Sequence, residues 1–331
     1  MIYLGIDIGG ANTKVATSDG TIVELHYLPL WKNTTLPKEL KEIAIRIKPD
    51  VTGVVITGEL ADCFEDKIQG LKFIMNAVDD AFLNNVNYID INGHIYKEGD
   101  ELRNLAAANW IASSILIGKE IGDCIFVDVG STTTDIIPIT GAKHMAATTD
   151  FKRLLASELI YMGTLRTNVA TIVDMVKTQQ GTCRVSAELF TTTGDIYLLL
   201  GDIKPSSYTC ETADGAGISK IEVLRRVARL VCADLHEICE DDIMEIARQV
   251  KEKQISLLTE AISTVSCKHG INRIVAAGIG EFMIVEAARK LKMECISVAD
   301  KWGKEISDVF PAYAAARLIE KIYKNHKEDI N

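Results

Sequence analysis

Short apolar blocks separated by glycine-containing turns open the chain and predict a three-strand meander. Apolar residues 2–8 end at Gly9, a second extended block covers 13–17, and a third covers 21–28 after the turn at Gly20. Runs of this length bounded by glycine are typical of β-strands joined as hairpins. The N-terminal segment is therefore expected to form three consecutive antiparallel strands.

Helical and extended patterns alternate after the meander. The residues after Pro37 show helical periodicity, 53–58 form a continuous apolar block typical of a buried strand, and 87–91 are again extended. An apolar-rich stretch over 102–117 predicts a strong helix with Gly118 and Gly122 as its stop. This order of strands and helices indicates a mixed α/β architecture.

The same pattern starts again in the second third of the chain. Residues 5–20 and 126–141 align without a gap at a constant offset of 121 residues. The identical pairs are Asp7 with Asp128, Gly9 with Gly130, Thr13 with Thr134 and Gly20 with Gly141. Because solenoid repeats are much shorter, this spacing predicts two copies of one domain. We expect one domain over 1–117 and a second over 118–331, the second with a helical insertion at about 150–270.

Composition and charge argue against several classes of function. Of the 331 residues, 47% are apolar and 25% are charged, as in ordinary globular proteins. The net charge of −10 argues against a surface that binds nucleic acid or anionic lipid. No apolar stretch is long enough to span a bilayer, so we expect no membrane partner and a cytoplasmic location. The eight cysteines have no CxxC spacing, which argues against a zinc or iron–sulfur site.

The repeated turn is suited to binding phosphate. Glycine lets the backbone turn tightly and approach a ligand, and successive amide N–H groups can then surround an anion. Hydroxyl groups add donors, and a lysine adds positive charge. The predicted phosphate-binding residues are Gly9, Gly10, Ala11, Asn12, Thr13 and Lys14 in the first copy and Gly130, Ser131, Thr132 and Thr133 in the second. The alternative is that these are ordinary turn residues.

Two carboxylates and two further glycines complete the candidate site. Asp7 and Asp128 end apolar strands, where an unpaired carboxylate is costly, so each is expected to bind a partly hydrated Mg²⁺ or a hydrogen-bond donor. Gly278 and Gly280 lie where a strand meets a helix, a place where free amide groups bind anions or face a nucleobase.

Paired glycine-rich hairpins followed by a strand-Gly-x-Gly-helix element resemble the superfamily of actin, sugar kinases and heat-shock-70 ATPases. This resemblance implies two ribonuclease-H-like domains with a central cleft. Five segments more narrowly resemble the hydantoinase/oxoprolinase-related branch, and within it the aryl-ether synthases of methanofuran biosynthesis in archaeal and methylotroph one-carbon metabolism. These segments are GIDIGGANTK at 5–14, ITGELADCF at 56–64, AAANW at 106–110, VDVGSTTTDIIPI at 127–139 and YMGTLRTNV at 161–169.

The resemblance implies a transferase that does not consume ATP. Members of that family join an aminomethyl-furanmethanol diphosphate to the phenol oxygen of γ-glutamyltyramine and release diphosphate. The phosphate-binding turns would then hold the leaving group of the substrate, and Mg²⁺ would stabilise the charge that develops on it. The implied partners are these small molecules, and a homodimer is a possible assembly.

Such a reaction also needs a base, because the phenol must lose its proton as it attacks. Glu59 and Asp62 follow a buried strand and Asp214 lies in a polar loop, and one of the three is expected to be the base. The alternatives are a capping pair at the next helix for the first two and a turn residue for Asp214. Arg166 is expected to bind the diphosphate or the glutamyl carboxylate through its planar fork, with an ion pair as the alternative.

Two other functions are compatible with the same fold. An ATP-dependent small-molecule kinase or ATPase is the first, and a non-catalytic nucleotide-responsive regulator is the second. ADP formation that depends on an acceptor would indicate the kinase, whereas tight nucleotide binding without turnover would indicate the regulator.

Overall fold

Two β-sheets organise the protein. The computed structural model describes residues 1–32, 35–83 and 85–328. The first sheet contains β1 (Tyr3–Gly9), β2 (Asn12–Thr17), β3 (Val23–Tyr27), β4 (Val51–Thr57) and β5 (Val86–Tyr88). Its strand order is β3-β2-β1-β4-β5. The first three strands pair antiparallel, whereas β4 pairs parallel with β1, and β5 pairs parallel with β4.

The second sheet repeats this order. It contains β6 (Cys124–Val129), β7 (Thr134–Thr140), β8 (Lys143–His144), β12 (Arg273–Ala277) and β13 (Glu294–Ser297), and β9 (Leu159–Ile160) pairs with β7 outside this path. Its order, β8-β7-β6-β12-β13, corresponds strand for strand to β3-β2-β1-β4-β5. The repetition confirms the predicted α/β fold class with two ribonuclease-H-like sheets.

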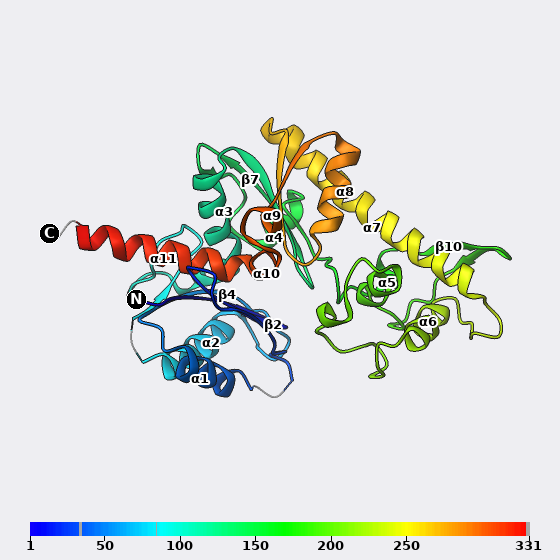
Figure 1. The fold of residues 1–331 in the computed structure, drawn as a ribbon, viewed down its shortest axis with the longest axis horizontal. Helices are drawn as coiled ribbons and strands as arrows, with labels where there is room; N and C mark the ends of the chain where they lie inside the picture. The colour runs from blue at the N-terminus through cyan, green and yellow to red at the C-terminus, as the bar shows by residue number, and fades with distance from the viewer. Residues whose placement is uncertain (33–34, 84, 329–331) are drawn as a thin grey trace. The chain divides into compact units, whose positions relative to one another are not determined.

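Helices occupy the segments between and after the strands (Figure 1). The α-helices are α1 (Leu36–Ile47), α2 (Lys67–Ala81), α3 (Asn109–Glu120), α4 (Asp150–Leu155), α5 (Thr193–Leu200), α6 (Lys220–Arg229), α7 (Glu240–His269), α8 (Glu281–Leu291), α9 (Val298–Trp302), α10 (Lys304–Asp308) and α11 (Phe310–Glu328). The remaining elements are the 3-10 helices η1 (Leu102–Leu105), η2 (Val169–Thr171) and η3 (Pro205–Ser207) and a hairpin of β10 (Met175–Thr178) and β11 (Gly181–Arg184). Among the residues that the structure describes, no helix combines the length and apolarity needed to cross a bilayer.

The helix predicted over 102–117 is wrong in its first part. The structure has η1, an irregular segment, and then α3. Ala107 has a left-handed backbone with φ of 52°, and the Ala108 N–H donates to the carbonyl oxygen of Ile56 at 3.1 Å. This bond to β4 takes the place of a helical bond, so a tertiary contact overrides the helix propensity of the alanine run.

Of the two predicted stop glycines, Gly118 lies inside α3, which continues to Glu120, whereas Gly122 follows the end of the helix with a φ of 93°. A Cβ atom at Gly118 would lie 3.0 Å from the Cα and the carbonyl oxygen of Ala142. Glycine therefore serves a close approach between α3 and the segment joining β7 and β8.

The chain folds into two compact units, each discontinuous in sequence. Unit 1 contains Met1–Phe126, Ile137–Leu155 and the chain from Ser297 onward, and unit 2 contains Val127–Ile136 and Ala156–Ile296. The boundaries between the units fall within β6, within β7, after α4 and within β13 rather than at one point of the chain. The domain boundaries expected from the sequence, 1–117 and 118–331, therefore stay a prediction.

In unit 1, helices cover both faces of the first sheet. β1 and β4 are buried along nearly their whole lengths, which is typical of strands between two helical layers. Figure 1 shows α11 on one side of these strands and α1 and α2 on the other. Leu40 and Ile43 of α1 and Ile74 of α2 share a core cluster with Ile6 and Ile8 of β1. The C-terminal helix thus completes the unit that contains the N-terminus.

In unit 2, the long helix α7 supports the helical insertion. It packs against α5, α6, α8 and β10. Val227 of α6 and Ile243 and Val250 of α7 are fully buried in the second core cluster. This core anchors the loop 204–217 between α5 and α6, which carries one of the candidate bases.

Candidate functional site

The first hairpin turn, between β1 and β2, places a buried carboxylate beside a lysine. Asp7 is 2% exposed and lies directly across the hairpin from Lys14. The Lys14 Nζ atom is 3.4 Å from Asp7 Oδ2, and the Thr57 hydroxyl donates to Asp7 Oδ1 at 3.2 Å. The strand carboxylate therefore has a cation and a donor from its own unit, as a buried charge requires.

Only part of the predicted binding segment in this hairpin reaches the surface. Gly9, Gly10 and Lys14 are partly exposed. Ala11 and Asn12 are buried, and Thr13 is fully buried, which takes the predicted hydroxyl donor of Thr13 away from solvent. The Gly10 carbonyl oxygen accepts a bond from the Leu30 N–H at 2.9 Å, so the turn is fixed from the segment that follows β3.

The second hairpin turn, between β6 and β7, is covered by the segment 163–166. The Gly130 N–H donates to the Thr133 carbonyl oxygen at 2.9 Å and closes the turn, so this amide is not a free donor. The N–H groups of Leu165 and Arg166 both donate to the Ser131 carbonyl oxygen at 3.0 Å. These bonds fix the shape of the turn, while Ser131, Thr132 and Thr133 stay partly exposed.

Arg166, a candidate from the sequence for binding diphosphate or carboxylate, lies at this turn. Its Nη1 atom donates to the Thr132 hydroxyl oxygen at 3.0 Å. The residue is partly exposed. A guanidinium group in this position brings planar, permanently charged donors to the same loop whose hydroxyl groups were expected to bind phosphate.

The turn between β12 and α8 packs against β6. Gly278 has a φ of 91°, and a Cβ atom there would collide with Asp128 Oδ1 and the Val129 carbonyl oxygen. The Gly280 N–H donates to the Val129 carbonyl oxygen at 2.9 Å. The structure therefore places Gly278 against Asp128 and Gly280 against Val129, at the end of β6, but the amide of Gly280 is used internally rather than free for an anion.

Glu59 is a buried carboxyl group that follows β4. It is 1% exposed, its Oε1 atom lies 3.4 Å from Lys67 Nζ, and its Oε2 atom has no hydrogen-bond partner among the described residues. Burial raises the pKa of this carboxyl group, and the Lys67 charge opposes the rise only in part. Such a group takes up a proton more readily than an exposed glutamate.

Asp62 is exposed, and neither it nor Glu59 caps the next helix. The cap of α2 is Asp66, whose side chain accepts a bond from the Gln69 N–H at 2.8 Å. The capping alternative for Glu59 and Asp62 is therefore wrong.

Asp214 is held by two arginines. Its Oδ1 atom lies 3.1 Å from Arg226 Nη1, and its Oδ2 atom lies 2.9 Å from Arg229 Nη1. Burial alone would raise the pKa of Asp214, but the Ala216 N–H and the two arginines outweigh it and lower that pKa. Arg226 is also paired with the fully buried Asp195 at 2.7 Å. These contacts give Asp214 a structural role, because they hold its loop in place.

Several residues of the site were missed by the sequence reasoning. Thr57 and Gly163 contact candidate residues that are distant in sequence, and Lys67 contacts Glu59, eight residues before it. A Cβ atom at Gly163 would lie 2.5 Å from the Thr132 nitrogen, so only glycine lets this segment cover the second hairpin. Gly163 lies inside the segment YMGTLRTNV and Thr57 inside ITGELADCF, so both offered a signal, whereas nothing in the local pattern marked Lys67.

The carboxylates near the two hairpins could bind Mg²⁺ only together with ligands from a bound substrate and water. Among the described residues, no group of three or more His, Cys, Asp or Glu side chains could hold a metal ion. Mg²⁺ commonly binds through one or two carboxylates together with substrate phosphates and water. Asp128 beside the second hairpin fits that arrangement, whereas Asp7 already has Lys14 as its cation.

A family model and two similar proteins match this chain. The family model described as hydantoinase/oxoprolinase matches residues 50–322. A protein of Methanocaldococcus jannaschii named (4-{4-[2-(gamma-L-glutamylamino)ethyl]phenoxymethyl}furan-2-yl)methanamine synthase is 35% identical over 329 residues, covering 97% of this chain and 98% of that protein. A protein of Methanococcus vannielii with the same name is 36% identical over 202 residues, covering 60% of this chain and 91% of its own.

Solved structures add a likeness in fold. The nucleotide-free structure of acetone carboxylase aligns with a TM-score of 0.50 and 11% sequence identity. The alignment covers 92% of this chain and 51% of that chain. At this identity the likeness concerns the fold alone.

Proposed function

The chain belongs to the hydantoinase/oxoprolinase family, and we propose that it is the synthase that forms the aryl ether (4-{4-[2-(γ-L-glutamylamino)ethyl]phenoxymethyl}furan-2-yl)methanamine. The observation that carries this proposal is the 35% identity to a synthase of that name over 97% of this chain. The reaction joins the furfuryl carbon of an aminomethyl-furanmethanol diphosphate to the phenol oxygen of γ-glutamyltyramine. The carbon–oxygen bond to diphosphate breaks, diphosphate leaves, and the phenol proton passes to a base.

In this proposal the second hairpin binds the diphosphate. The partly exposed hydroxyl groups of Ser131, Thr132 and Thr133 offer donors on a turn whose backbone is already fixed. The Arg166 guanidinium reaches Thr132 and supplies positive charge that matches phosphate oxygens. Donors that are held in place before the substrate arrives stabilise developing negative charge without further reorganisation.

We also assign Mg²⁺ to Asp128 in this proposal. The carboxylate is 5% exposed and lies against Gly278, close to the hairpin that would hold the phosphates. A bound Mg²⁺ would act as a Lewis acid on the leaving diphosphate. The cytoplasmic location and the homodimer stay predictions.

Glu59 is the base that its surroundings favour among the three candidates. A general base must be ionised and yet have a substantial affinity for a proton. Burial raises the pKa of Glu59, and Lys67 at 3.4 Å lets the ionised form exist. Asp214 is disfavoured for this role, because two arginines hold it and its pKa is lowered.

Mass spectrometry of the reaction products tests this function directly. The purified protein is mixed with Mg²⁺, the furan diphosphate and γ-glutamyltyramine, without nucleotide. We expect the aryl ether and diphosphate in equal amounts, with no increase when ATP is added. Formation of ADP that depends on an acceptor, with no ether in any mixture, would instead establish a kinase.

A further inference from the structure

A surface groove of ≈ 330 Å³ lies between α3 and α11, within unit 1. Apolar side chains of Ile115, Leu116 and Leu318 line part of it. None of its lining residues belongs to the two hairpins or to the three candidate bases. The groove is therefore a feature separate from the site described above, and the inference drawn from it does not rest on the proposed function.

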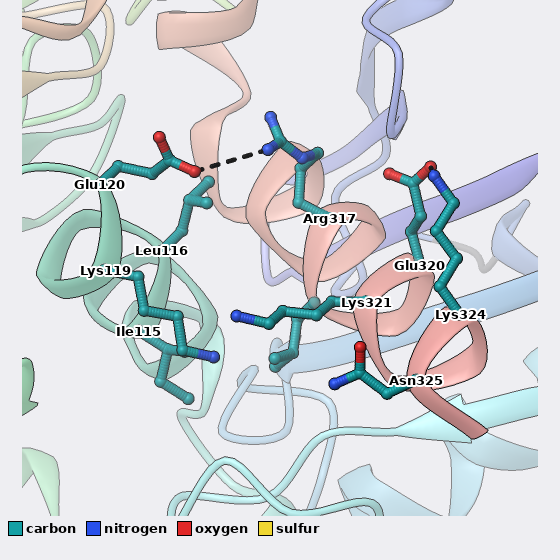
Figure 2. Close-up of a pocket in the computed structure, with 10 residues that line it drawn as sticks. Ile115, Leu116, Lys119, Glu120, Arg317, Glu320, Lys321, Lys324 and Asn325 are labelled. Carbon is teal, nitrogen blue, oxygen red and sulfur yellow. Dashed lines mark ion pairs between the residues drawn. The ribbon is translucent and has the colours of Figure 1, made fainter. Parts of the chain in front are cut away.

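Two of the basic side chains in the groove have acidic partners. Arg317 Nη2 lies 3.6 Å from Glu120 Oε1, and Lys324 Nζ lies 2.7 Å from Glu320 Oε1. Figure 2 shows the Arg317–Glu120 contact at one end of the groove and the Lys324–Glu320 contact at the other. The charges of these four residues are balanced within the groove.

The remaining two basic side chains, Lys119 and Lys321, extend toward each other across the groove. Figure 2 shows their ammonium ends side by side between the two helices. In the part of the chain that the structure describes, no ion pair joins either lysine to a carboxylate. Burial lowers the pKa of Lys119, and the neighbouring Lys321 charge lowers it further. Two ammonium groups of like charge thus lie close together in the groove without a carboxylate between them.

A dianion would relieve this repulsion, because each ammonium group offers three N–H donors and no acceptor. A phosphate monoester carries about −1.5 to −2 charges at neutral pH and three acceptor oxygens, whereas a carboxylate carries one charge. The apolar residues that line the same groove suit the organic part of such a molecule. We propose that the groove between α3 and α11 binds a small organic phosphate whose phosphate group lies between Lys119 and Lys321.

Calorimetric titration with phenyl phosphate at neutral pH and low salt tests this site in the full-length protein. The single variants Lys119→Met and Lys321→Met are each expected to weaken binding about tenfold, since a hydrogen bond to a charged group contributes on this scale. The double variant should show no measurable binding. Lys119→Arg and Lys321→Arg keep the charge and should retain most of the affinity.

Two control variants locate the effect. Lys290→Met removes an exposed lysine on α8 and should leave the affinity unchanged. Lys72→Met removes an exposed lysine on α2, in the same unit as the groove, and should also leave it unchanged. Loss of binding in either control variant, or full binding in the double lysine variant, would overturn the proposal by placing the ligand outside the groove. Absence of binding to the native protein would overturn it as well.

Two further probes test the chemical class. Benzoate, which has the ring but only one charge, should bind more weakly than phenyl phosphate. Inorganic phosphate should also bind more weakly, because it makes no apolar contacts. Equal affinity for benzoate would refute the preference for phosphate, and equal affinity for inorganic phosphate would refute the organic part of the ligand. Circular dichroism of each variant confirms that it is folded.

Discussion

The two hairpins have the same turn but draw their positive charge from different places. In the first, Lys14 lies across the strand pair from Asp7 and forms an ion pair with it. In the second, the position of Lys14 is taken by Asp135, and Arg166 arrives from a separate segment to contact the loop itself. The two copies thus share the same backbone turn, but the positive charge contacts the strand carboxylate in the first copy and the exposed loop in the second.

The same carbonyl position is fixed from outside in both hairpins. The Gly10 carbonyl accepts a bond from Leu30, and the Ser131 carbonyl, 121 residues later, accepts bonds from Leu165 and Arg166. In both copies, therefore, a later segment fixes the turn through its backbone. In the second copy, that segment also brings the Arg166 side chain to the Thr132 hydroxyl group. We therefore expect Lys14 to act mainly on stability and Arg166 mainly on ligand binding.

The largest expected effect is on turnover in Arg166→Met. Removing a preorganised donor to a developing anion commonly costs about 10²–10³-fold in turnover number. We expect a loss of this size in the ether-forming assay, with an intermediate loss in Arg166→Lys, because lysine keeps the charge but not the planar fork. Urea unfolding should show that Arg166→Met is nearly as stable as the native protein. Native turnover in Arg166→Met would end the assignment of the second hairpin as the diphosphate site.

Lys14→Met is expected to act on stability instead. The Lys14 side chain is 17% exposed and the Asp7 side chain is 3% exposed. The variant therefore removes the Lys14 cation from a buried carboxylate. Breaking such a pair costs about 3 kcal/mol in the free energy of unfolding. Adding Asp7→Asn to Lys14→Met should restore much of this loss. A variant Lys14→Met that unfolds like the native protein but has lost activity would show that the first lysine binds ligand too.

Local sequence was sufficient for the hairpins and insufficient for their surroundings. The turns were predictable because Asp7, Gly9 and their counterparts 121 residues later specify a short-range backbone geometry. The contact of Thr57 with Asp7 and the covering of the loop by Gly163 depend on how distant segments pack. No periodicity encodes such contacts.

In the alanine run around Ala107, the local sequence predicts a helix that a tertiary contact prevents. Its composition favours a helix, and the structure breaks it where the Ala108 amide bonds to β4. The gain in tertiary hydrogen bonding there exceeds a local preference that amounts to a few tenths of a kcal/mol per residue, on the order given by helix propensities.

Glycine substitutions compare the packing of the two turns. A Cβ atom in Gly163→Ala would lie 2.5 Å from the Thr132 nitrogen and the Ser131 carbonyl carbon, whereas Gly10→Ala would meet nothing within 4 Å. We expect Gly163→Ala to lower the free energy of unfolding by about 2 kcal/mol, as in other overpacked sites, and Gly10→Ala to leave it nearly unchanged. Urea denaturation curves measure both. Equal stability of the two variants would contradict the close covering of the second hairpin.

The smallest effects concern the pH dependence of stability at two carboxyl groups, one in each unit. The pKa of Glu59 is raised by burial, so its ionisation opposes folding as the pH rises from about the unfolded value through the folded one. Glu59→Gln removes this penalty, and its stability relative to the native protein should increase with pH over that window. If Glu59 is the base, the same variant loses ether formation while becoming relatively more stable.

Asp214 should behave with the opposite sign. The pKa of Asp214 is lowered in the folded protein, because the Ala216 N–H and two arginines outweigh the effect of burial. Ionised Asp214 therefore stabilises the fold above the unfolded pKa. This contribution is lost as the pH falls through the folded pKa. Asp214→Asn should therefore be destabilised by about 1 kcal/mol at neutral pH, the scale of one net hydrogen bond, and the difference should vanish in acid. Thermal melts between acid and neutral pH measure both variants. Because Asp214→Asn is expected to keep its turnover per folded molecule, a variant that is stable but inactive would move the base to unit 2.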